Sequence, residues 1–475
     1  MSVKSANSVS GRATTSGRVP PLAGSYTSST QHPRVFTNQK ELTQLAKRSN
    51  VAGSFSAQNF SRLTTQIKQD LAAKVDWAAA YSGCDLAIYL RTFSYEARTG
   101  YAAEVRSEEQ LKSALRVRND ATAPAGAALV AARLALYAAL LKAGATPLEQ
   151  APEAEAAAQL AKQILLAWAE RGFRDAKGAR FQSSQQFCGN DGKPEDANVG
   201  LQLGRGVVYS VQAQDLLQAQ GALNSAEVKQ LNAFHLGLFD LIRLALNRRV
   251  EQPMQDCERY SNHSAAALTG MLSIARLLDD GKRFNAVLKG GDAAYPVALP
   301  WLVQFNRAIY GEGDSPVACY PNPGKDSLTS KPSFQTAKVE PGEIEDRYRN
   351  ANPLQGIGYP MFALELITNG AAILQQAGFD AWGYRGAQQQ SIGAAIAYYA
   401  CYGKVVGFNK TVTAENAKSC PNHAQYVGKM VHGVESMVLL GSARYPKNAE
   451  ITELEEAARK GRMVVDGVRF GMWRD

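Results

Sequence analysis

The chain of 475 residues carries 52 basic and 43 acidic side chains, so its net charge is +9. With 45% hydrophobic and 20% charged residues, it has the composition of a soluble globular protein and the length for a large core. A positive balance suits a polyanionic partner, but nucleic acid is disfavoured because no dense Lys/Arg block with interleaved aromatics occurs. No apolar run approaches the roughly 18 residues that a membrane span needs.

Helical periodicity predicts about a dozen helices along the chain. In chain order they are expected at 38–47, 60–80, 83–93, 123–143, 152–171, 199–220, 225–247, from 262 onwards, and at 293–310, 352–376, 386–402, 424–445 and 451–460. Residues 98–118 are less clear, and a short strand is conceivable only near 463–470.

The alternation of helices with short and long loops predicts an all-α protein built from antiparallel helical hairpins. No repeat of fixed period occurs, which favours an α/α toroid over a helical solenoid array. We expect residues 1–30, rich in Ser, Thr and Gly, to be disordered, and residues 31–475 to form a single large domain. The Pro- and Gly-rich stretch 311–341 is interpreted as a loop over a cleft, because helices of the same type continue beyond it.

Cysteine usage bears on the compartment. None of the six cysteines has CxxC spacing, so no structural zinc site is expected; they are Cys84, Cys188, Cys257, Cys319, Cys401 and Cys420. Several lie in loop-like stretches, which favours one to three disulfides over six reduced thiols. Residues 1–31 contain no apolar signal core. We therefore expect a periplasmic or secreted protein whose signal peptide is not part of this sequence, with an intracellular protein as the alternative.

The polar cluster Arg259-Tyr260-Ser261-Asn262-His263 runs directly into a predicted helix. Ser261 or Asn262 can cap that helix, and a helix start is electropositive and presents free N–H groups to a carboxylate. An Asn-His pair at this place can hydrogen-bond an acidic substrate and transfer a proton. In the alternative interpretation, Asn262 is only a cap and the backbone satisfies His263.

A second polar cluster spans residues 343–350 and is followed by Tyr359. Arg347 and Arg349 are two residues apart, so both can face a substrate from an extended loop, and arginine suits bidentate recognition of a carboxylate. Tyr348 and Tyr359 are candidate proton donors. Alternatively, the arginines pair with neighbouring acidic residues as a solvated charge run.

These residue types match what β-elimination on a uronic acid requires. The enzyme must neutralise the carboxylate, remove the weakly acidic proton beside it and protonate the leaving glycosidic oxygen. Asn and Arg serve the first need, and His or Tyr serves the other two, so no metal or cofactor is expected. Further substrate contacts are expected from Asn190, Asn198, Arg205, Tyr260 and Trp382, although core packing explains Trp382 equally well.

Three stretches resemble motifs of a known family. They are His32-Pro33-Arg34-Val35-Phe36, Ser261-Asn262-His263, and Gly358-Tyr359-Pro360-Met361-Phe362-Ala363-Leu364 followed by Gly378-Phe379-Asp380-Ala381-Trp382-Gly383-Tyr384. In these pieces, and in the order of elements over roughly residues 30–445, the chain resembles the alginate-lyase-like toroidal polysaccharide lyases of the family 38 or family 5 type.

The resemblance implies a toroidal domain with a cleft for an acidic chain. It implies that Asn262 helps to neutralise the carboxylate, that His263 is a base or a second neutralising group, and that Tyr359 is the acid. The family places an arginine shortly before this tyrosine, where the present chain has Asn352-Pro353-Leu354-Gln355. Arg347 and Arg349 therefore remain alternatives for that role, and Tyr348 remains a rival acid.

The leading hypothesis is a lyase for alginate, particularly its mannuronate blocks, with glucuronan as the second substrate. A toroidal glycoside hydrolase would need two facing carboxylates, for which the candidates are Glu258, Glu345, Asp346 and Glu365. A non-catalytic protein that binds acidic glycans is the third hypothesis. His235 is interpreted as a core residue, and His423 and His432 have no third ligand at metal spacing. The sequence does not indicate an oligomeric state.

Overall fold

The computed structural model describes residues 19–73, 127–147, 152–171, 199–251, 259–314, 339–345, 357–408, 410–431 and 435–460. Within these ranges the named elements are all α-helices, and β pairing is confined to three isolated bridges. The predicted all-α class is therefore confirmed. None of the helices in the described ranges is long and apolar enough to cross a membrane.

The chain divides into two compact units that alternate along the sequence. Unit 1 contains residues 1–25, 246–268 and 285–463, and unit 2 contains residues 26–245, 269–284 and 464–475. Helices α9 (Ser225–Glu251), α11 (Asn262–Leu277) and α12 (Gly281–Lys289) contribute residues to both. We expected one domain from residue 31. Three of the boundaries between the units fall inside the helices α9, α11 and α12, so composition reveals no linker at these places.

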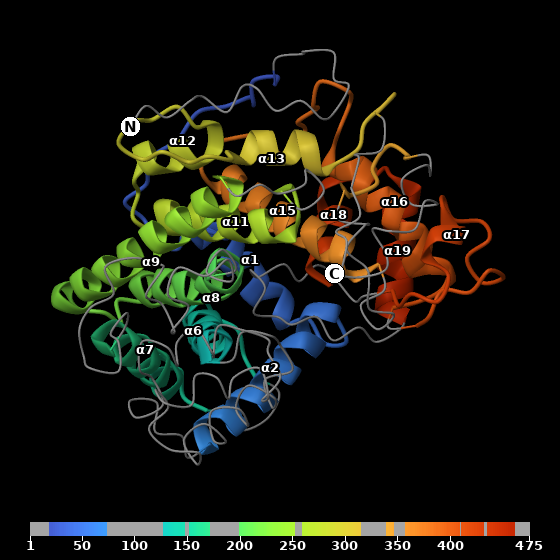
Figure 1. Ribbon diagram of the computed structural model, residues 1–475. Helices are drawn as coiled ribbons and strands as arrows, with labels where there is room; N and C mark the ends of the chain where they lie inside the picture. The colour runs from blue at the N-terminus through green and yellow to red at the C-terminus, as the bar shows by residue number, and fades with distance from the viewer. Residues whose placement is uncertain are drawn as a thin grey trace, which may run out of the picture. The chain divides into compact units, whose positions relative to one another are not determined.

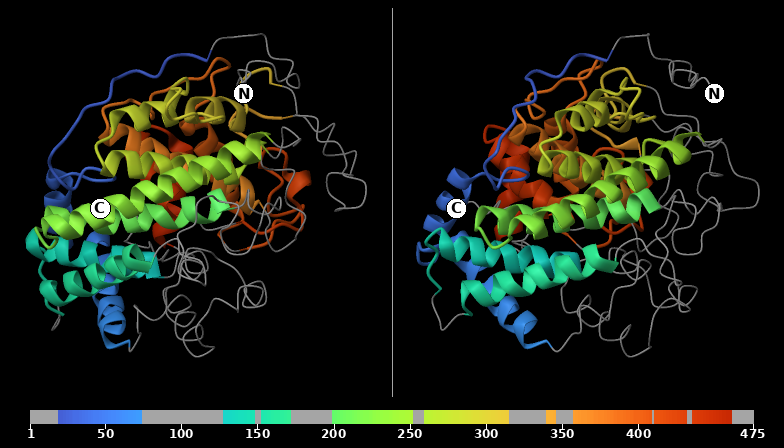
Figure 2. Two further views of the ribbon diagram at one scale, coloured as in Figure 1. Left: turned by 60° about the vertical axis from the view of Figure 1, so that its left-hand side comes forward. Right: turned by 90° about the vertical axis from the view of Figure 1, so that its left-hand side faces the viewer.

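Unit 2 is built around helix α6 (Ala127–Lys142), which packs against α1 (Gln39–Ser49), α2 (Phe55–Ala72), α7 (Ala154–Arg171) and α8 (Val199–Ala219). Figures 1 and 2 show α6, α7 and α8 side by side. The α6 sequence AALVAARLALYAALLK is apolar nearly all round, and its residues 128–140 are buried. A helix without a polar face is stable only when neighbours cover it on all sides, so α6 forms the core of the unit.

One charged side chain interrupts this apolar helix. Arg133 of α6 is 3% exposed and makes a bidentate ion pair with Asp70 of α2, which is 6% exposed. A buried charge is tolerated only when it is paired and hydrogen-bonded, and the planar guanidinium fits a carboxylate in this way. The pair therefore fixes the register of α2 on α6.

Close packing between α8 and the second half of α11 depends on glycine. A Cβ atom at Gly270 would lie 2.8 Å from the Cα of Gly204 and 2.9 Å from Cγ1 of Val207. Because the first of these contacts is to backbone, the clash cannot be relieved by turning a side chain. The two helices approach as closely as they do because neither carries a side chain at the contact.

Gly270→Ala is expected to lower the free energy of unfolding by about 1–3 kcal/mol, the usual cost of overpacking. This loss should appear although alanine is by itself the better helix former by roughly 1 kcal/mol. Urea unfolding followed by circular dichroism measures it. Gln230→Ala, at an exposed position of α9 in the same unit, is the control and should change stability little. An unchanged Gly270→Ala protein would contradict the close approach.

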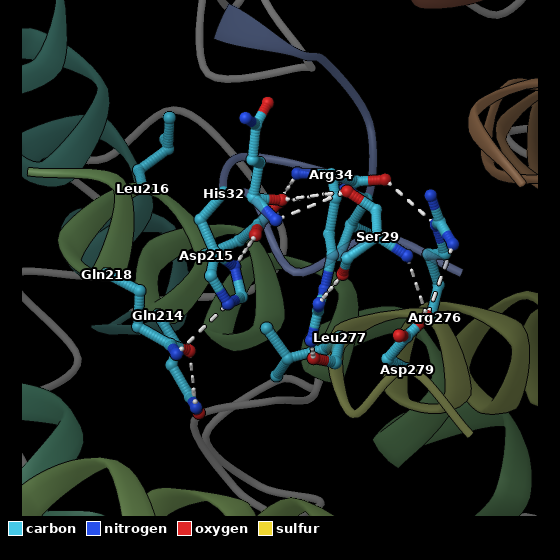
Figure 3. Close-up of polar contacts among 12 residues, drawn as sticks. Ser29, His32, Arg34, Gln214, Asp215, Leu216, Gln218, Arg276, Leu277 and Asp279 are labelled. Atoms are coloured by element: carbon cyan, nitrogen blue, oxygen red, sulfur yellow. Dashed lines mark hydrogen bonds and ion pairs between the residues drawn. The ribbon is translucent and has the colours of Figure 1, made fainter. Parts of the chain in front are cut away.

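Residues 26–36 of unit 2, here called the N-terminal strap, are tied down by a buried carboxylate. Asp215 of α8 is 2% exposed, and its Oδ1 lies 2.6 Å from Nδ1 of His32. Its Oδ2 accepts the backbone N–H groups of Arg34 and Val35, both at 2.8 Å. Figure 3 shows the carboxylate pointing into the strap. One side chain thus orders a segment that has no regular secondary structure of its own.

A second carboxylate, Asp279, holds the start of the strap just beyond α11. Tyr26 Oη donates to Asp279 Oδ1 at 2.8 Å, and Ser28 Oγ and the Ser29 N–H also donate to this carboxylate. Burial would raise the pKa of Asp279, but these hydrogen bonds lower it overall. Arg276 donates from Nη1 to the carbonyl oxygen of Thr27 at 2.7 Å.

The expectation of disorder up to residue 30 therefore needs a correction. Residues 26–30 carry the hydrogen bonds to Asp279, and in unit 1 the Asp380 N–H donates to the Ala23 carbonyl oxygen at 3.0 Å. The Ser- and Thr-rich composition misled the prediction because these short polar side chains bind partners more than 200 positions away. Residues 1–18 lie outside the described residues.

His235 of α9 is confirmed as a core residue. Its side chain is fully buried, with Nε2 2.9 Å from Ser210 Oγ and Nδ1 2.8 Å from Gln214 Oε1. Burial disfavours the charged imidazolium and lowers the pKa of His235 to about 3. In the unfolded chain the pKa of this side chain is near 6.5. Between about pH 3 and pH 6.5, His235 is therefore protonated in the unfolded chain and neutral in the folded protein.

Stability should accordingly fall with pH below about 6.5, by about 1.4 kcal/mol per pH unit from this histidine alone. Replacing His235 by Gln removes the titrating group while it keeps a polar side chain beside Ser210. The loss in unfolding free energy between pH 7 and pH 5 should then be about 2 kcal/mol smaller in the variant than in the parent. Equal losses in the two proteins, measured by urea unfolding at both pH values, would show that His235 is not the cause.

Unit 1 contains the helices α13 (Trp301–Ala308), α15 (Gly358–Gln376), α16 (Ile392–Val405), α17 (His423–Tyr426), α18 (Glu435–Arg444) and α19 (Ala449–Lys460). Helix α15 packs on α16 and α18, and α19 packs on the same two helices. Figure 1 shows α16, α18 and α19 together. A disulfide joins Cys401 of α16 to Cys420, in agreement with the expectation of one to three disulfides.

Helix starts follow capping residues that the sequence displays. Asn38 forms a capping box with Glu41 at the start of α1, and Ser54 and Ser391 cap α2 and α16. Asn224 accepts the N–H groups of residues 226 and 227 at the start of α9. These signals explain why predicted and observed starts agree closely for α1 and α9.

Candidate functional site

The start of α11 carries the Asn-His pair. Ser261 caps this helix, because its Oγ accepts the His263 N–H at 3.4 Å and its carbonyl oxygen accepts the N–H groups of Ser264 and Ala265. Asn262 is the first helical residue and is 2% exposed, and His263 is half-buried. The capping role therefore belongs to Ser261, and the amide of Asn262 is not needed for it.

Gln304 of α13 holds the turn that precedes α11. The side chain is 1% exposed, and its Nε2 donates to the carbonyl oxygen of Tyr260 at 2.7 Å and to that of Ser261 at 3.4 Å. A buried amide on these two carbonyls fixes the backbone from which Asn262 and His263 extend. Sequence reasoning missed Gln304, since a single glutamine within a helical run carries no local signal.

Tyr359 is the second residue of α15 and is half-buried. The N-cap position is Ile357, which offers no side-chain hydrogen bond to the helix, and the Ile357 N–H donates to the Met430 carbonyl oxygen at 3.0 Å. The start of α15 therefore lacks the side-chain acceptor that commonly satisfies the first N–H groups of a helix. Tyr359 thus lies at an electropositive helix start, as Asn262 does in α11.

The residues that precede the predicted arginine segment are firmly held. Glu343 is fully buried and accepts hydrogen bonds from Tyr426 Oη at 3.0 Å and from Asn422 Nδ2 at 3.1 Å. The Ile344 N–H donates to Tyr399 Oη at 2.9 Å. Burial, with a further contribution from Glu343, raises the pKa of Tyr399 well above its usual value. Tyr399 is therefore a structural hydrogen-bonding group rather than an acid near neutral pH.

Some of the predicted site residues lie together in unit 1, one lies in unit 2, and others lie outside the described residues. Tyr260, Asn262, His263, Tyr359 and Trp382 all belong to unit 1. Arg205 is half-buried in α8, which belongs to unit 2. Five residues lie outside the described residues, namely Asn190, Asn198, Arg347, Tyr348 and Arg349. Of the carboxylates considered for a hydrolase, Glu345 is fully buried and Glu365 is 5% exposed, whereas Glu258 and Asp346 lie outside the described residues.

Trp382 is placed differently from Tyr359. Tyr359 is in the first turn of α15, and Trp382 follows the last turn, which lies roughly 25 Å away along the helix at 1.5 Å per residue. The Trp382 ring is 6% exposed and carries the Arg444 guanidinium at 5.9 Å and the Tyr445 ring at 6.2 Å. Trp382 therefore has no open face for stacking on the sugar that Tyr359 would act on.

Among the described residues, no three His, Cys, Asp or Glu side chains are gathered in the manner of a metal site. No protein-family model matches the chain, and the search of curated proteins finds no significant match. A functional assignment therefore depends on the motifs and on the geometry of unit 1.

Proposed function

We propose that the protein is a polysaccharide lyase that cleaves a polyuronate by β-elimination. The observation that carries the proposal is that two helix starts with the required side chains belong to the same compact unit. One presents Asn262 and His263, and the other presents Tyr359. An amide, an imidazole and a phenol at electropositive helix ends form the set that elimination beside a carboxylate needs.

In this mechanism the Asn262 amide and the positive end of the α11 dipole neutralise the substrate carboxylate, which makes the neighbouring C–H proton more acidic. A base, His263 or Tyr359, removes that proton. The electron pair of the C–H bond forms a carbon–carbon double bond, the bond to the glycosidic oxygen breaks, and Tyr359 donates a proton to the leaving oxygen. An arginine, Arg347 or Arg349, would share in neutralising the carboxylate.

The arrangement of helices that we propose for this activity is an α/α toroid. It is supported by successive helices that pack on their neighbours within each unit, α6 on α7 and α8, and α15 on α16 and α18. A periplasmic or secreted location is supported by the disulfide between Cys401 and Cys420, because disulfides persist in oxidising compartments.

The substrate that we propose is alginate, particularly its mannuronate blocks, with glucuronan as the second choice. The net charge of +9 favours a polyanionic chain. The test is to incubate the protein with mannuronate-rich alginate, guluronate-rich alginate and glucuronan, and to follow the far-ultraviolet absorbance and the mass of the products. Unsaturated products from one polymer are expected. Reducing ends without unsaturation would point to a hydrolase, and binding without turnover to a non-catalytic protein; either result overturns the proposal.

A further inference from the structure

Unit 1 contains an open cavity of about 570 Å³ at the end of α15 that lies away from Tyr359. Gln375 in the last turn of α15, Asp380 and Trp382 in the turn that follows, and Arg444 and Tyr445 at the end of α18 line it. Because α15 separates it from Tyr359 by roughly 25 Å, the cavity is distinct from the proposed catalytic residues. Its volume is within the range of small-ligand sites.

Asp380 lines this cavity and is exposed, and only one of its two carboxylate oxygens has a hydrogen-bond partner in the described part of the chain. Asp380 Oδ1 accepts the Gly383 N–H at 2.9 Å, and the Asp380 N–H donates to the Ala23 carbonyl oxygen at 3.0 Å, so the residue is fixed at both ends. Its Oδ2 makes no hydrogen bond within the described part of the chain. A Cβ atom at position 383 would lie 2.3 Å from Oδ2, so a glycine at that position leaves the oxygen accessible.

Positive charge lies on the other wall. The Arg444 guanidinium is held over the Trp382 ring, and Tyr445 Oη donates to the Trp382 carbonyl oxygen at 2.6 Å. Burial raises the pKa of Tyr445, so the hydroxyl stays a donor, while the nearby charges of Arg385 and Arg444 act in the opposite direction. Trp382 Nε1 is buried and has no acceptor among the described residues. An N–H donor without an acceptor is costly unless a ligand or water completes it.

We propose that this cavity is a second, non-catalytic binding site for one acidic sugar unit. The ligand carboxylate binds Arg444, with Arg385 adding to the positive potential. The hydroxyl groups of the sugar donate to Asp380 Oδ2 and accept a hydrogen bond from the Trp382 N–H. With the Gln375 amide they can act both as donors and as acceptors. A carboxylate without hydroxyls makes no hydrogen bond to Asp380 Oδ2, and a neutral sugar cannot form the charge-assisted hydrogen bond with Arg444, so both features are needed. The site does not depend on the proposed lyase chemistry.

The test follows the indole N–H resonance of Trp382 by nitrogen-labelled tryptophan NMR of the full chain, assigned with Trp382→Phe. Titration with sodium D-glucuronate should shift this resonance saturably. D-glucose and sodium acetate should bind at least tenfold more weakly, because each lacks one of the two features. Asp380→Asn keeps an oxygen for the Gly383 N–H but removes the charge, and should weaken glucuronate binding at least tenfold, as should Arg444→Gln. Gly383→Ala should block the site.

Arg62→Gln, an exposed arginine change in α2 of unit 2, is the matched control and should leave the titration unchanged. Thermal unfolding midpoints of all variants establish that they fold. A Trp382 resonance that does not respond to glucuronate would overturn the proposal, and so would an unchanged affinity in both Asp380→Asn and Arg444→Gln. Absence of lyase turnover with a normal titration would leave this site standing and overturn only the catalytic proposal.

Discussion

Replacing Tyr359 by Phe should lower polyuronate turnover by about a hundredfold to ten-thousandfold, the usual contribution of a positioned acid. The substitution removes one oxygen atom from a half-buried ring in the first turn of α15 and leaves the ring itself in place. Since the hydroxyl is proposed to act on the leaving oxygen in the transition state, kcat should fall and KM should change little. Initial rates of unsaturated product formation over a range of polymer concentrations measure both constants.

Variants of α11 should distinguish the roles at the other helix start. His263→Ala should lower kcat by a factor similar to that of Tyr359→Phe if the imidazole is the base. Asn262→Ala removes a preorganised donor and should cost about a hundredfold to a thousandfold in kcat. Because these groups act on one transition state, the double variant Tyr359→Phe with His263→Ala should lose less than the product of the two single losses.

The matched control is Tyr295→Phe, which removes a hydroxyl from another half-buried tyrosine of unit 1. Its turnover should equal that of the parent. Full turnover by Tyr359→Phe would rule out the phenol as the acid and would turn attention to Tyr348. If Tyr359→Phe lost turnover and also unfolded at a clearly lower temperature than the parent, the defect would be in folding rather than in catalysis.

Local signals explain why most helices were predicted near their observed bounds. The predicted ranges 152–171 and 199–220 correspond to α7 at Ala154–Arg171 and α8 at Val199–Ala219. Both have apolar spacing that persists over several turns, which is the strongest sequence signal for a helix. The ranges 83–93 and 98–118 and the possible strand at 463–470 lie outside the described residues.

The misplaced elements have local causes as well. The helix predicted at 293–310 begins only at Trp301, because Pro296 and Pro300 interrupt the run before it. The helix predicted at 424–445 is divided into α17 and α18, and Gly428 between them has a φ of +82°. The helix α12 was not predicted separately; it begins at Gly281, only four positions after α11 ends at Leu277.

The candidate site was predictable only in its local part. Asn262 and His263 follow a Ser that caps a helix, and this relation is visible in the sequence. Gln304, which supports that turn, lies 44 positions after Tyr260 and 43 positions after Ser261 in the sequence. The cavity at the end of α15 likewise combines residues 375–383 with Arg444 and Tyr445. Such pairings depend on tertiary packing, so no spacing rule along the chain reveals them.

Replacing Asp215 by Ala should release the N-terminal strap at a cost of about 2–6 kcal/mol, because two backbone N–H groups lose their acceptor and each buried donor left unsatisfied costs about 1–3 kcal/mol. The carboxylate is 2% exposed and serves His32 and two backbone N–H groups at once. Alanine leaves all three donors without their acceptor in a buried place.

Amide hydrogen exchange gives a local measurement of this release. The N–H groups of Arg34 and Val35 donate to Asp215 Oδ2, so their exchange should become at least about a hundredfold faster in Asp215→Ala, since about 1.4 kcal/mol corresponds to a factor of ten. The control is Asp240→Asn, which removes the charge of a 46% exposed aspartate paired with Arg243 on the surface of α9. Surface pairs contribute about 0–1 kcal/mol, so this variant should exchange like the parent. Slow exchange of the two strap amides in Asp215→Ala would mean that Asp279 and Arg276 hold the strap without help from α8.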